Sequence, residues 1–260
     1  MSTEAEPPRS GLMETAVIIA EALAIALFVR VLFFQPFNIP SGSMKNTLLI
    51  GDYLFVSKLS YGYSKYSFPW SPDLFSGRIF AGEPNRGDVV VFKKPPQNDT
   101  DYIKRVIGLP GDEVQMQKGV LFLNGKAIPK EPAGEFENIE CDDAQVYCRN
   151  VRYKRYKETL PEGLSYYVLD LTTEGFHDTT NVFKVPPGHY FVMGDNRDNS
   201  TDSRVQSAAG VGFVPLENFI GKAQVIFFSA AVDEPGRFNW SSPWTWPFDI
   251  RWNRFFNLVR

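Results

Sequence analysis

The strongest constraint on the fold of this chain is one long apolar run near its N-terminus. The run covers residues 15–34 and contains two charged side chains, Glu21 and Arg30. As an α-helix, such a run reaches ~30 Å, which matches the hydrocarbon thickness of a bilayer. We therefore expect one transmembrane anchor at 15–34, with a short tail at 1–14 before it and the main domain at 35–260.

Two other interpretations of this run compete with the anchor. A cleavable signal peptide needs a basic start and small residues at its end, whereas the tail holds three glutamates and one arginine and the run ends in Phe33 and Phe34. A retained anchor is therefore favoured over a signal peptide. A buried helix of a soluble domain remains an alternative. Flanking charges give no orientation, because Arg9 lies on one side and Lys45 on the other.

The composition excludes several classes of protein. The 27 basic and 30 acidic residues give a formal net charge of −3, which argues against a nucleic-acid partner because such binding needs a positive field. A hydrophobic content of 43% with 22% charged residues excludes a disordered chain and a protein made mostly of membrane spans. A four-ligand zinc site needs all the histidines and cysteines of the chain or added carboxylates, so we expect no metal site and no cofactor. These residues are His177, His189, Cys141 and Cys148.

Beyond the anchor, the sequence predicts a mostly β fold. Short aromatic and β-branched runs alternate with Gly, Pro and Asp, which is typical of strands joined by turns. The strongest local pattern is 120–123 followed by Asn124-Gly125, since Asn-Gly supplies the positive φ angles of a type I′ hairpin turn. Further strands are expected at 53–56, 89–92, 166–169, 189–193 and 223–228.

Two segments depart from this pattern. Residues 133–162 are polar, dense in charges of both signs and contain both cysteines, which predicts an inserted surface loop. Cys141 and Cys148 can close a small ring, so a disulfide is expected outside the cytoplasm and two free thiols in a reducing compartment. The aromatic C-terminal segment, residues 240–260, holds four of the five tryptophans among arginines. It suits either the headgroup layer of a bilayer or packing on its own domain.

Candidate reactive groups begin directly after the anchor. Ser41 and Ser43 flank a glycine there, which places hydroxyl groups near the membrane surface. Lys104 stands among apolar neighbours in a predicted strand, and because Lys104 and Arg105 point to opposite faces, one of the two is expected to face inward. Burial lowers the pKa of a lysine, and a fall from ~10.4 to ~8 makes the amine a base near neutral pH.

A third group of polar residues lies at 194–204. Ser200 offers a hydroxyl, and the alternating carboxylate and guanidinium groups around it can lock a loop by bidentate pairing. An ordinary polar turn or an Asp/Asn-rich calcium loop is the competing interpretation. The spacing lacks the glycine and the terminal glutamate of an EF-hand.

Four motifs in this order carry a resemblance to a known family. FNIPSGSM at 37–44, RGDVVVF at 86–92, DYIKRVIGLPGD at 101–112 and GDNRDNSTDSR at 194–204 follow the anchor. Together they resemble the bacterial type I signal peptidases, Ser/Lys endopeptidases of peptidase family S26 that release exported proteins. The resemblance implies a signal-peptidase-like β domain behind a single transmembrane helix, and it covers about residues 37–221.

The resemblance also implies roles for individual residues. Ser43 matches the nucleophile and Lys104 the general base, while Ser41 and the Ser43 N–H match the oxyanion hole. Ser200 matches the hydroxyl that orients the lysine. Asp202 and Arg204 match an acidic and basic pair that supports the site structurally. Ile39 and Ile103 are expected to line shallow pockets that accept small side chains. The residues after Ser43 depart from the family pattern, because Asn46 stands where proline often precedes Thr-Leu.

The partners and location follow from the same resemblance. We expect signal-peptide-bearing preproteins as substrates, cleaved at an A-x-A-like site, with the lipid bilayer and the export translocon as further partners. The expected location is the bacterial plasma membrane, with a cytoplasmic N-terminus and the catalytic domain on the outer face. Three alternatives remain: a Ser-His-Asp hydrolase that uses His177 or His189, a maturation peptidase dedicated to one exported protein, and a catalytically inactive membrane-anchored binding module.

Overall fold

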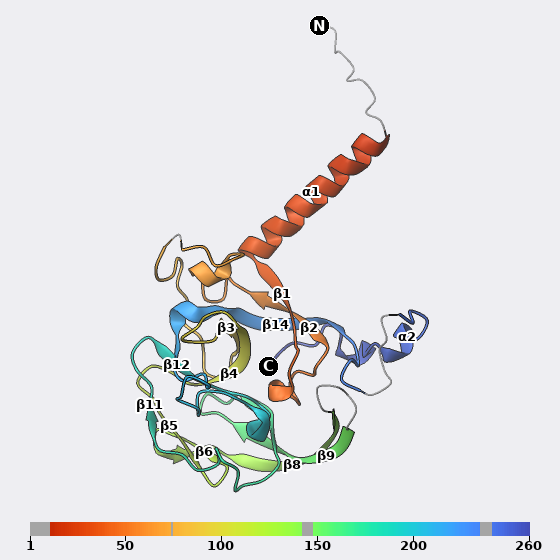
Figure 1. Ribbon diagram of the computed structural model, residues 1–260. Coiled ribbons are helices and arrows are strands. Elements are labelled where there is room, and N and C mark those ends of the chain that lie inside the picture. The colour runs from red at the N-terminus through yellow and green to blue at the C-terminus, as the bar shows by residue number, and fades with distance from the viewer. Residues whose placement is uncertain (1–10, 74, 142–147, 235–240) are drawn as a thin grey trace, which may run out of the picture.

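A single long helix precedes the β domain and joins it at the domain's N-terminal end. The computed structural model describes residues 11–73, 75–141, 148–234 and 241–260 (Figure 1). Helix α1 (Gly11–Leu32) projects away from the domain with none of its side chains buried (Figure 1). It is long and apolar enough to cross a membrane, and its exposure contradicts the alternative of a buried core helix.

The helix ends two residues before the predicted anchor does. Leu32 is its last residue, and Phe34 already belongs to strand β1 (Phe34–Asn38). Pro36 explains this end, because proline disfavours helical φ and ψ angles at the residue before it. The β domain therefore begins almost immediately after the helix.

A seven-stranded antiparallel sheet forms the centre of the domain. In spatial order its strands are β1 (Phe34–Asn38), β2 (Asp52–Ser57), β14 (Phe219–Ser229), β3 (Val89–Lys93), β4 (Asp101–Gly108), β12 (His189–Met193) and β13 (Val214–Pro215). Apolar clusters cover both faces, since Val91 of β3 packs in one cluster and Val90 in another. This two-sided burial explains the continuous apolar run at 89–92. The predicted mostly β fold is confirmed.

A smaller four-stranded sheet contains the predicted hairpin. Its strands are β11 (Phe183–Lys184), β5 (Glu113–Gln117), β6 (Val120–Leu123) and β7 (Lys126–Ala127), in that order. Asn124 and Gly125 have φ angles of 51° and 76°, and they join β6 to β7. The prediction of a tight Asn-Gly turn is therefore confirmed.

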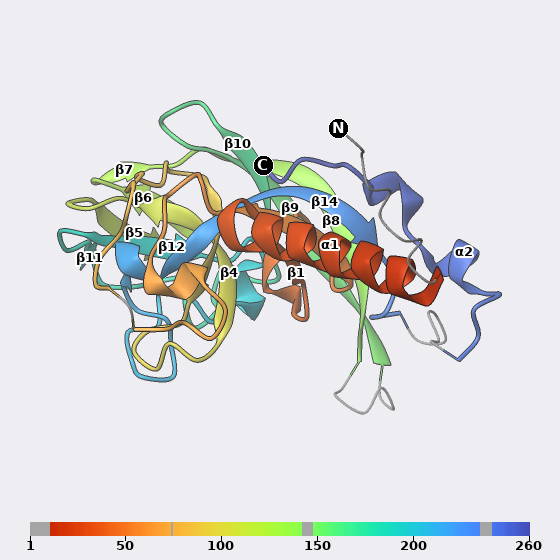
Figure 2. The same cartoon turned by 90° about the horizontal axis from the view of Figure 1, so that it is seen from above.

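The predicted inserted loop at 133–162 is wrong, because most of it is a long β-ribbon. Strands β8 (Lys130–Cys141) and β9 (Cys148–Thr159) pair with each other, and β10 (Ser165–Asp170) pairs with β9. The ribbon extends from the rest of the domain in Figure 2. It is polar because much of it is exposed, and opposite charges such as Glu137 and Arg152 face each other across it.

The cysteines occupy opposite positions in this ribbon. Cys141 pairs with Cys148 in the register of β8 and β9. The side chain of Cys141 lies outside the described residues, so the disulfide stays a prediction.

Short helices complete the domain. They are α2 (Trp246–Asp249) and the 3₁₀ turns η1 (Gly42–Met44), η2 (Lys65–Ser67), η3 (Arg197–Asn199), η4 (Leu216–Asn218) and η5 (Trp252–Arg254). The C-terminal residues after η5 bond to the backbone of β14, for example from Val259 to Gln224. Nevertheless Trp244 and Phe248 remain 72% and 80% exposed. The aromatic C-terminal segment thus packs on its own domain through its backbone while it exposes rings to the surroundings.

Candidate active site

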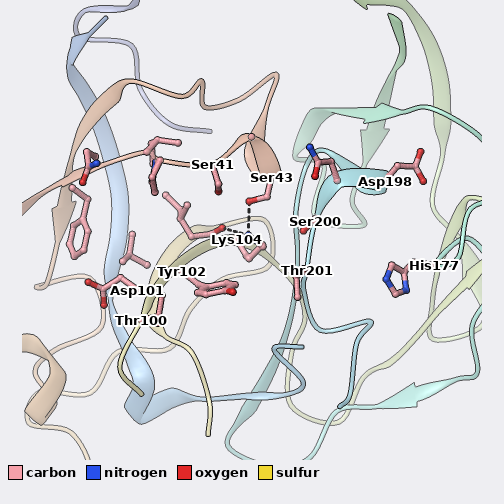
Figure 3. A pocket seen from close by; sticks show the side chains of 18 residues that line it. Ser41, Ser43, Thr100, Asp101, Tyr102, Lys104, His177, Asp198, Ser200 and Thr201 are labelled. Atoms are coloured by element: carbon pink, nitrogen blue, oxygen red, sulfur yellow. Dashed lines mark hydrogen bonds between the residues drawn. The ribbon is translucent and has the colours of Figure 1, made fainter. Parts of the chain in front are cut away.

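An open cavity lies where β1, η1 and β4 approach the segment 198–201. Its volume is about 610 Å³, and its wall includes Ser41, Ser43, Lys104 and Ser200 (Figure 3). Candidate residues from three widely separated segments of the chain therefore meet at one cavity.

Ser43 and Lys104 form the centre of the site. Lys104 Nζ donates a hydrogen bond to Ser43 Oγ over 2.7 Å (Figure 3). Both side chains are buried, at 8% and 3% exposure. Ser43 lies in the tight η1 turn, while Lys104 lies in β4 opposite Val90 of β3. The turn and the sheet thus hold the hydroxyl and the amine in contact.

Burial sets the proton affinity of Lys104. Desolvation lowers the pKa of this amine to about 8, although the Asp202 and Asp195 carboxylates act in the opposite direction. Lys104 Nζ also donates to the Ile103 carbonyl over 2.9 Å. This lowered pKa agrees with the value expected from the sequence. A substantial fraction of the amine is therefore neutral at mildly alkaline pH.

Ser200 belongs to a buried polar network beside the pair. Its hydroxyl donates to Asp202 Oδ2 over 2.8 Å, and Arg204 pairs with the same carboxylate through Nη2 over 2.9 Å. The Gly194 N–H donates to Asp202 as well. The Arg204 guanidinium holds the pKa of Asp202 below its usual range, against the effect of burial. Asp202 therefore holds Ser200 at the cavity as a carboxylate.

Glycine is required at position 194 by close contacts. A Cβ atom there would lie 2.2 Å from Ser200 Oγ and 2.5 Å from the Ser43 carbonyl oxygen. Both distances are shorter than non-bonded contacts allow. The backbone at Gly194 therefore brings the Ser200 segment and the Ser43 turn together.

A second charged pair was missed by the sequence analysis. Arg105 binds Asp195 through two nitrogens, at 2.9 and 2.7 Å, and both side chains are almost completely buried. The expectation that only one of Lys104 and Arg105 faces inward is wrong, because β4 is covered on both faces. Asp195 stands inside the 194–204 motif, which was the available signal.

Asn196 also supports the nucleophile turn without having been expected to. Its N–H donates to the Ser43 carbonyl over 3.1 Å, and its Nδ2 donates to the Gly42 carbonyl over 3.2 Å. These bonds join the turn that carries Ser43 to the segment that carries Ser200. Sequence spacing alone does not reveal a contact of this kind.

The remaining candidates lie around the cavity. Ser41, Ile39 and Ile103 are part of its wall, and both isoleucines belong to one apolar cluster. His177 also lines the cavity, whereas His189 bonds to the Pro187 carbonyl through Nδ1. The side chain in hydrogen-bond contact with Ser43 Oγ is that of Lys104 and not of a histidine. The geometry therefore does not favour a Ser-His-Asp arrangement.

The fold and the site together define a mostly β hydrolase with a buried serine–lysine pair behind an apolar N-terminal helix. The profile of the family described as "Signal peptidase, peptidase S26" matches residues 12–228. The chain belongs to this family and is a serine peptidase that removes signal peptides.

Two curated relatives from Rickettsia agree with this assignment. Signal peptidase I of Rickettsia conorii (strain ATCC VR-613 / Malish 7) is 46% identical over 222 residues, which cover 82% of this chain and 78% of that protein. Signal peptidase I of Rickettsia typhi (strain ATCC VR-144 / Wilmington) is 45% identical over 219 residues, covering 81% and 78%. A crystal structure of a signal peptidase I from Enterococcus faecalis V583 is 26% identical, covers 54% of this chain and 96% of that chain, and gives a TM-score of 0.29.

Proposed function

We propose that this chain is a membrane-anchored endopeptidase in which Ser43 is the nucleophile and Lys104 the general base, and that it cleaves preproteins after small residues at an A-x-A-like site. The observation that carries this proposal is the 2.7 Å hydrogen bond between the buried Lys104 amine and the Ser43 hydroxyl. A serine hydroxyl needs an adjacent base to attack an amide, and a neutral lysine is a known base in such pairs.

The acylation step uses both groups. The neutral Lys104 amine takes the Ser43 proton while Ser43 Oγ bonds to the scissile carbonyl carbon. The resulting oxyanion accepts hydrogen bonds from the Ser43 N–H and the Ser41 hydroxyl, and each donor of this kind contributes ~3 kcal/mol. The Lys104 ammonium then gives its proton to the leaving amine as the carbon–nitrogen bond breaks. The signal peptide remains bound to Ser43 as an ester.

The deacylation step uses the same base. Lys104 takes a proton from water, and the hydroxide formed attacks the ester carbonyl carbon. The carbon–oxygen bond to Ser43 breaks and the Lys104 ammonium returns the proton to Ser43 Oγ. The signal peptide leaves as a carboxylic acid, which releases its proton to water and becomes a carboxylate. Every step is an acid–base or acyl-transfer step between the peptide, water, Ser43 and Lys104.

Ser200, Asp202 and Arg204 act as positioning residues in this proposal. The hydrogen bond from Ser200 to Asp202 holds the Ser200 hydroxyl at the cavity wall. From there its oxygen can accept a hydrogen bond from Lys104 when the amine turns during proton transfer. Arg204 donates two hydrogen bonds to the Asp202 carboxylate and so holds it in position beside Ser200.

Specificity for small residues is supported by the cavity wall. Ile39 and Ile103 are almost fully buried, so neighbouring groups keep either side chain from moving aside to make room for a larger substrate side chain. Small side chains such as alanine fit beside them without rearrangement. We propose these two isoleucines as the determinants of the small-residue preference.

The attachment of α1 supports a fixed position of the site at the membrane. Lys58 Nζ donates to the carbonyls of Arg30 and Val31 at the end of the helix, and to that of Ser67 in the β domain. We propose a plasma-membrane protein with a cytoplasmic N-terminus and an outward catalytic domain, which meets preproteins at the export translocon. The exposed rings of the C-terminal segment are proposed to contact lipid.

The test is processing of a model preprotein by the full chain in detergent. Ser43→Ala and Lys104→Met should each lower the cleavage rate by about 10⁴-fold or more while the thermal unfolding transition is retained. Ser76→Ala and Lys118→Met, which alter exposed residues of the same types, are the matched controls and should cleave normally. Normal cleavage by either site variant contradicts the proposal, and so does loss of cleavage in a His177→Gln, His189→Gln double variant.

A further inference from the structure

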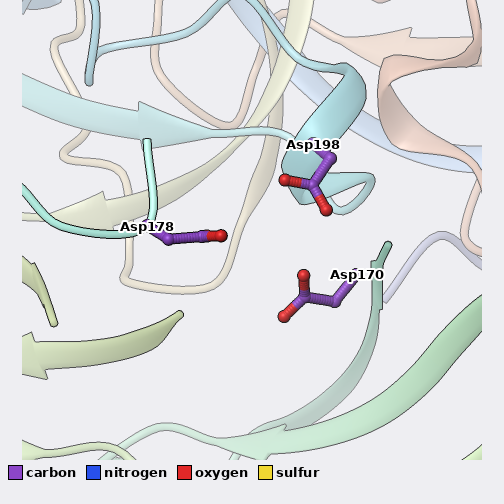
Figure 4. Close-up of side chains that lie close together, drawn as sticks. All are labelled: Asp170, Asp178 and Asp198. Atoms are coloured by element: carbon purple, nitrogen blue, oxygen red, sulfur yellow. The ribbon is translucent and has the colours of Figure 1, made fainter. Parts of the chain in front are cut away.

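Three aspartates from separate segments converge next to the Ser200 segment. Asp170 is the last residue of β10, Asp178 lies in the loop that follows, and Asp198 lies in η3. One carboxylate oxygen from each lies within 4.8 Å of the others (Figure 4). Asp170 and Asp178 are buried, at 2% and 1% exposure. Carboxylates repel one another at such distances unless a positive charge or a proton lies between them.

The protein holds one oxygen of each carboxylate in place. Asp198 Oδ2 accepts the N–H groups of Leu171 and Thr172, and Asp178 Oδ2 accepts that of Gly175. Asp170 Oδ2 pairs with Lys130. One oxygen of each carboxylate, Oδ2, is thus anchored by the protein.

Asp170 Oδ1 gives an independent indication of a missing ligand. This oxygen is buried, and within the described ranges of the chain it has no hydrogen-bond partner. A buried carboxylate oxygen without a partner is costly, because it has lost its water and gained nothing in return. In Figure 4 the Asp170 carboxylate points toward those of Asp178 and Asp198.

We propose that Asp170, Asp178 and Asp198 bind one Ca²⁺ ion, which fixes η3 and the Ser200 segment against the end of β10. Hard divalent cations prefer oxygen donors, and Ca²⁺ accepts irregular arrangements with water or carbonyl oxygens as the remaining ligands. Oxygens on opposite sides of Ca²⁺ are ~4.8 Å apart, from Ca–O distances of ~2.4 Å. The three oxygens can therefore bind one ion after small side-chain movements. Lys130 leaves two of the three negative charges for the cation to neutralise.

The site is structural and separate from the proposed chemistry. Asp198 stands two positions before Ser200, and both line the cavity. A cation that binds Asp198 to Asp170 and Asp178 thus orders the wall of the active site without touching Ser43. The expectation of no metal rested on the scarcity of histidine and cysteine, whereas these ligands are carboxylates that only the fold brings together.

The competing occupant is a proton. Burial and the neighbouring Asp198 carboxylate raise the pKa of Asp170, although Lys130 opposes them. A proton shared between Asp170 and Asp198 would relieve the repulsion without any cation. Metal titration at fixed pH separates the two, because a shared proton gives no response to Ca²⁺.

The test measures thermal unfolding of the full chain in detergent after treatment with EDTA and desalting. Ca²⁺ is titrated from 10 µM to 10 mM at constant ionic strength, with Mg²⁺ as a comparison. At about 100-fold excess over its dissociation constant, Ca²⁺ should raise the midpoint by about 5–10 °C. Mg²⁺ should raise it less, because it demands shorter and more regular coordination.

Two variants and one control locate the effect. Asp178→Asn and Asp198→Asn keep an oxygen for the backbone N–H groups but lose a charge, so both should abolish most of the Ca²⁺ shift. Asp73→Asn removes an exposed carboxylate elsewhere and should keep the full shift. No shift in the wild type, or an equal shift in all variants, overturns the proposal.

Equilibrium dialysis against ⁴⁵Ca²⁺ decides the matter if the aspartate variants do not fold. One ion bound per wild-type chain, displaced by excess Ca²⁺ and not by excess Na⁺, supports the site, and no bound ion overturns it. Both readouts are independent of peptide cleavage. Repeating them on Ser43→Ala protein therefore separates a failure of this site from a failure of the proposed function.

Discussion

Lys104 Nζ and Ser43 Oγ lie 2.7 Å apart although 61 positions separate the two residues in the chain. The contact joins a central strand of the sheet to a turn that follows the N-terminal helix. Because both groups are buried, water does not compete for the bond.

The cleavage rate should rise with pH through the pKa of Lys104. Burial lowers this pKa to about 8, and only the neutral amine can accept the Ser43 proton. The neutral fraction grows about tenfold between pH 7 and pH 9, and kcat/KM should grow with it. Measurement from pH 6 to pH 10 on a preprotein substrate checks this. A flat profile over that range would exclude Lys104 as the base.

Lys104→Met should stabilise the protein at neutral pH while it abolishes cleavage. The pKa of Lys104 is about 8 in the folded chain and 10.5 as the reference, so below pH 8 folding keeps a charged amine in a buried position. Replacement by methionine removes the unfavourable free energy of burying this charge, about 1–3 kcal/mol. Urea unfolding in detergent at pH 7 measures the gain.

The free energy of unfolding should depend on pH in the opposite direction to that expected from a lysine in a salt bridge, whose pKa is raised by folding. Between pH 8 and 10.5 the unfolded chain binds more protons than the folded one, so the stability of the wild type rises and its gap to the variant closes. Lys58, whose pKa burial also lowers to about 8, is present in both proteins and cancels. A gap that stays constant to pH 10.5 contradicts the assignment.

Gly194→Ala should cause a loss of cleavage beyond its effect on stability. The new Cβ meets Ser200 Oγ at 2.2 Å and the Ser43 carbonyl at 2.5 Å, so the two segments must separate. We expect kcat to fall by at least about tenfold, as small displacements of catalytic groups do. Gly163→Ala is the control, since its φ of +85° is strained but open space surrounds it. That variant should lose stability and keep its kcat per folded molecule.

Asp195→Ala should destabilise the fold more than the same substitution of a surface aspartate does. It leaves the Arg105 guanidinium buried without its partner, which costs about 3–5 kcal/mol. Asp73→Ala breaks the exposed pair with Lys65 and should change the unfolding free energy by less than about 1 kcal/mol. Denaturant titrations of the two variants give the comparison. Similar values for both would show that the buried pair adds nothing.

Local pattern was sufficient for much of the fold. The apolar run predicted α1, short aromatic and β-branched runs predicted β2, β3, β4, β12 and β14 of the main sheet but not β1 or β13, and Asn124-Gly125 predicted its turn. These signals depend on neighbours within a few positions, so they survive without tertiary context. The ribbon of β8 and β9 was missed because its exposed faces leave a polar composition that is typical of loops.

Residue types and motif order predicted the candidate site residues, and the apolar neighbours of Lys104 suggested a lowered pKa. Neither showed which groups lie in contact or how completely each is buried. A lysine has an ordinary pKa until surrounding groups remove water from it, and this depends on strands that pair with β4 from distant parts of the chain. The same holds for Arg105 and Asp195, whose pairing follows from burial on the second face of β4.

By itself, the sequence determined the helix that can cross a membrane, the mostly β character of the domain and the residue types available for chemistry. Only the tertiary structure decided which groups meet: Ser43 with Lys104, Ser200 with Asp202, and Asp170 with Asp178 and Asp198. The physical reason is that helices and strands arise from short-range periodicity. Contact and desolvation arise from long-range packing, which no local pattern records.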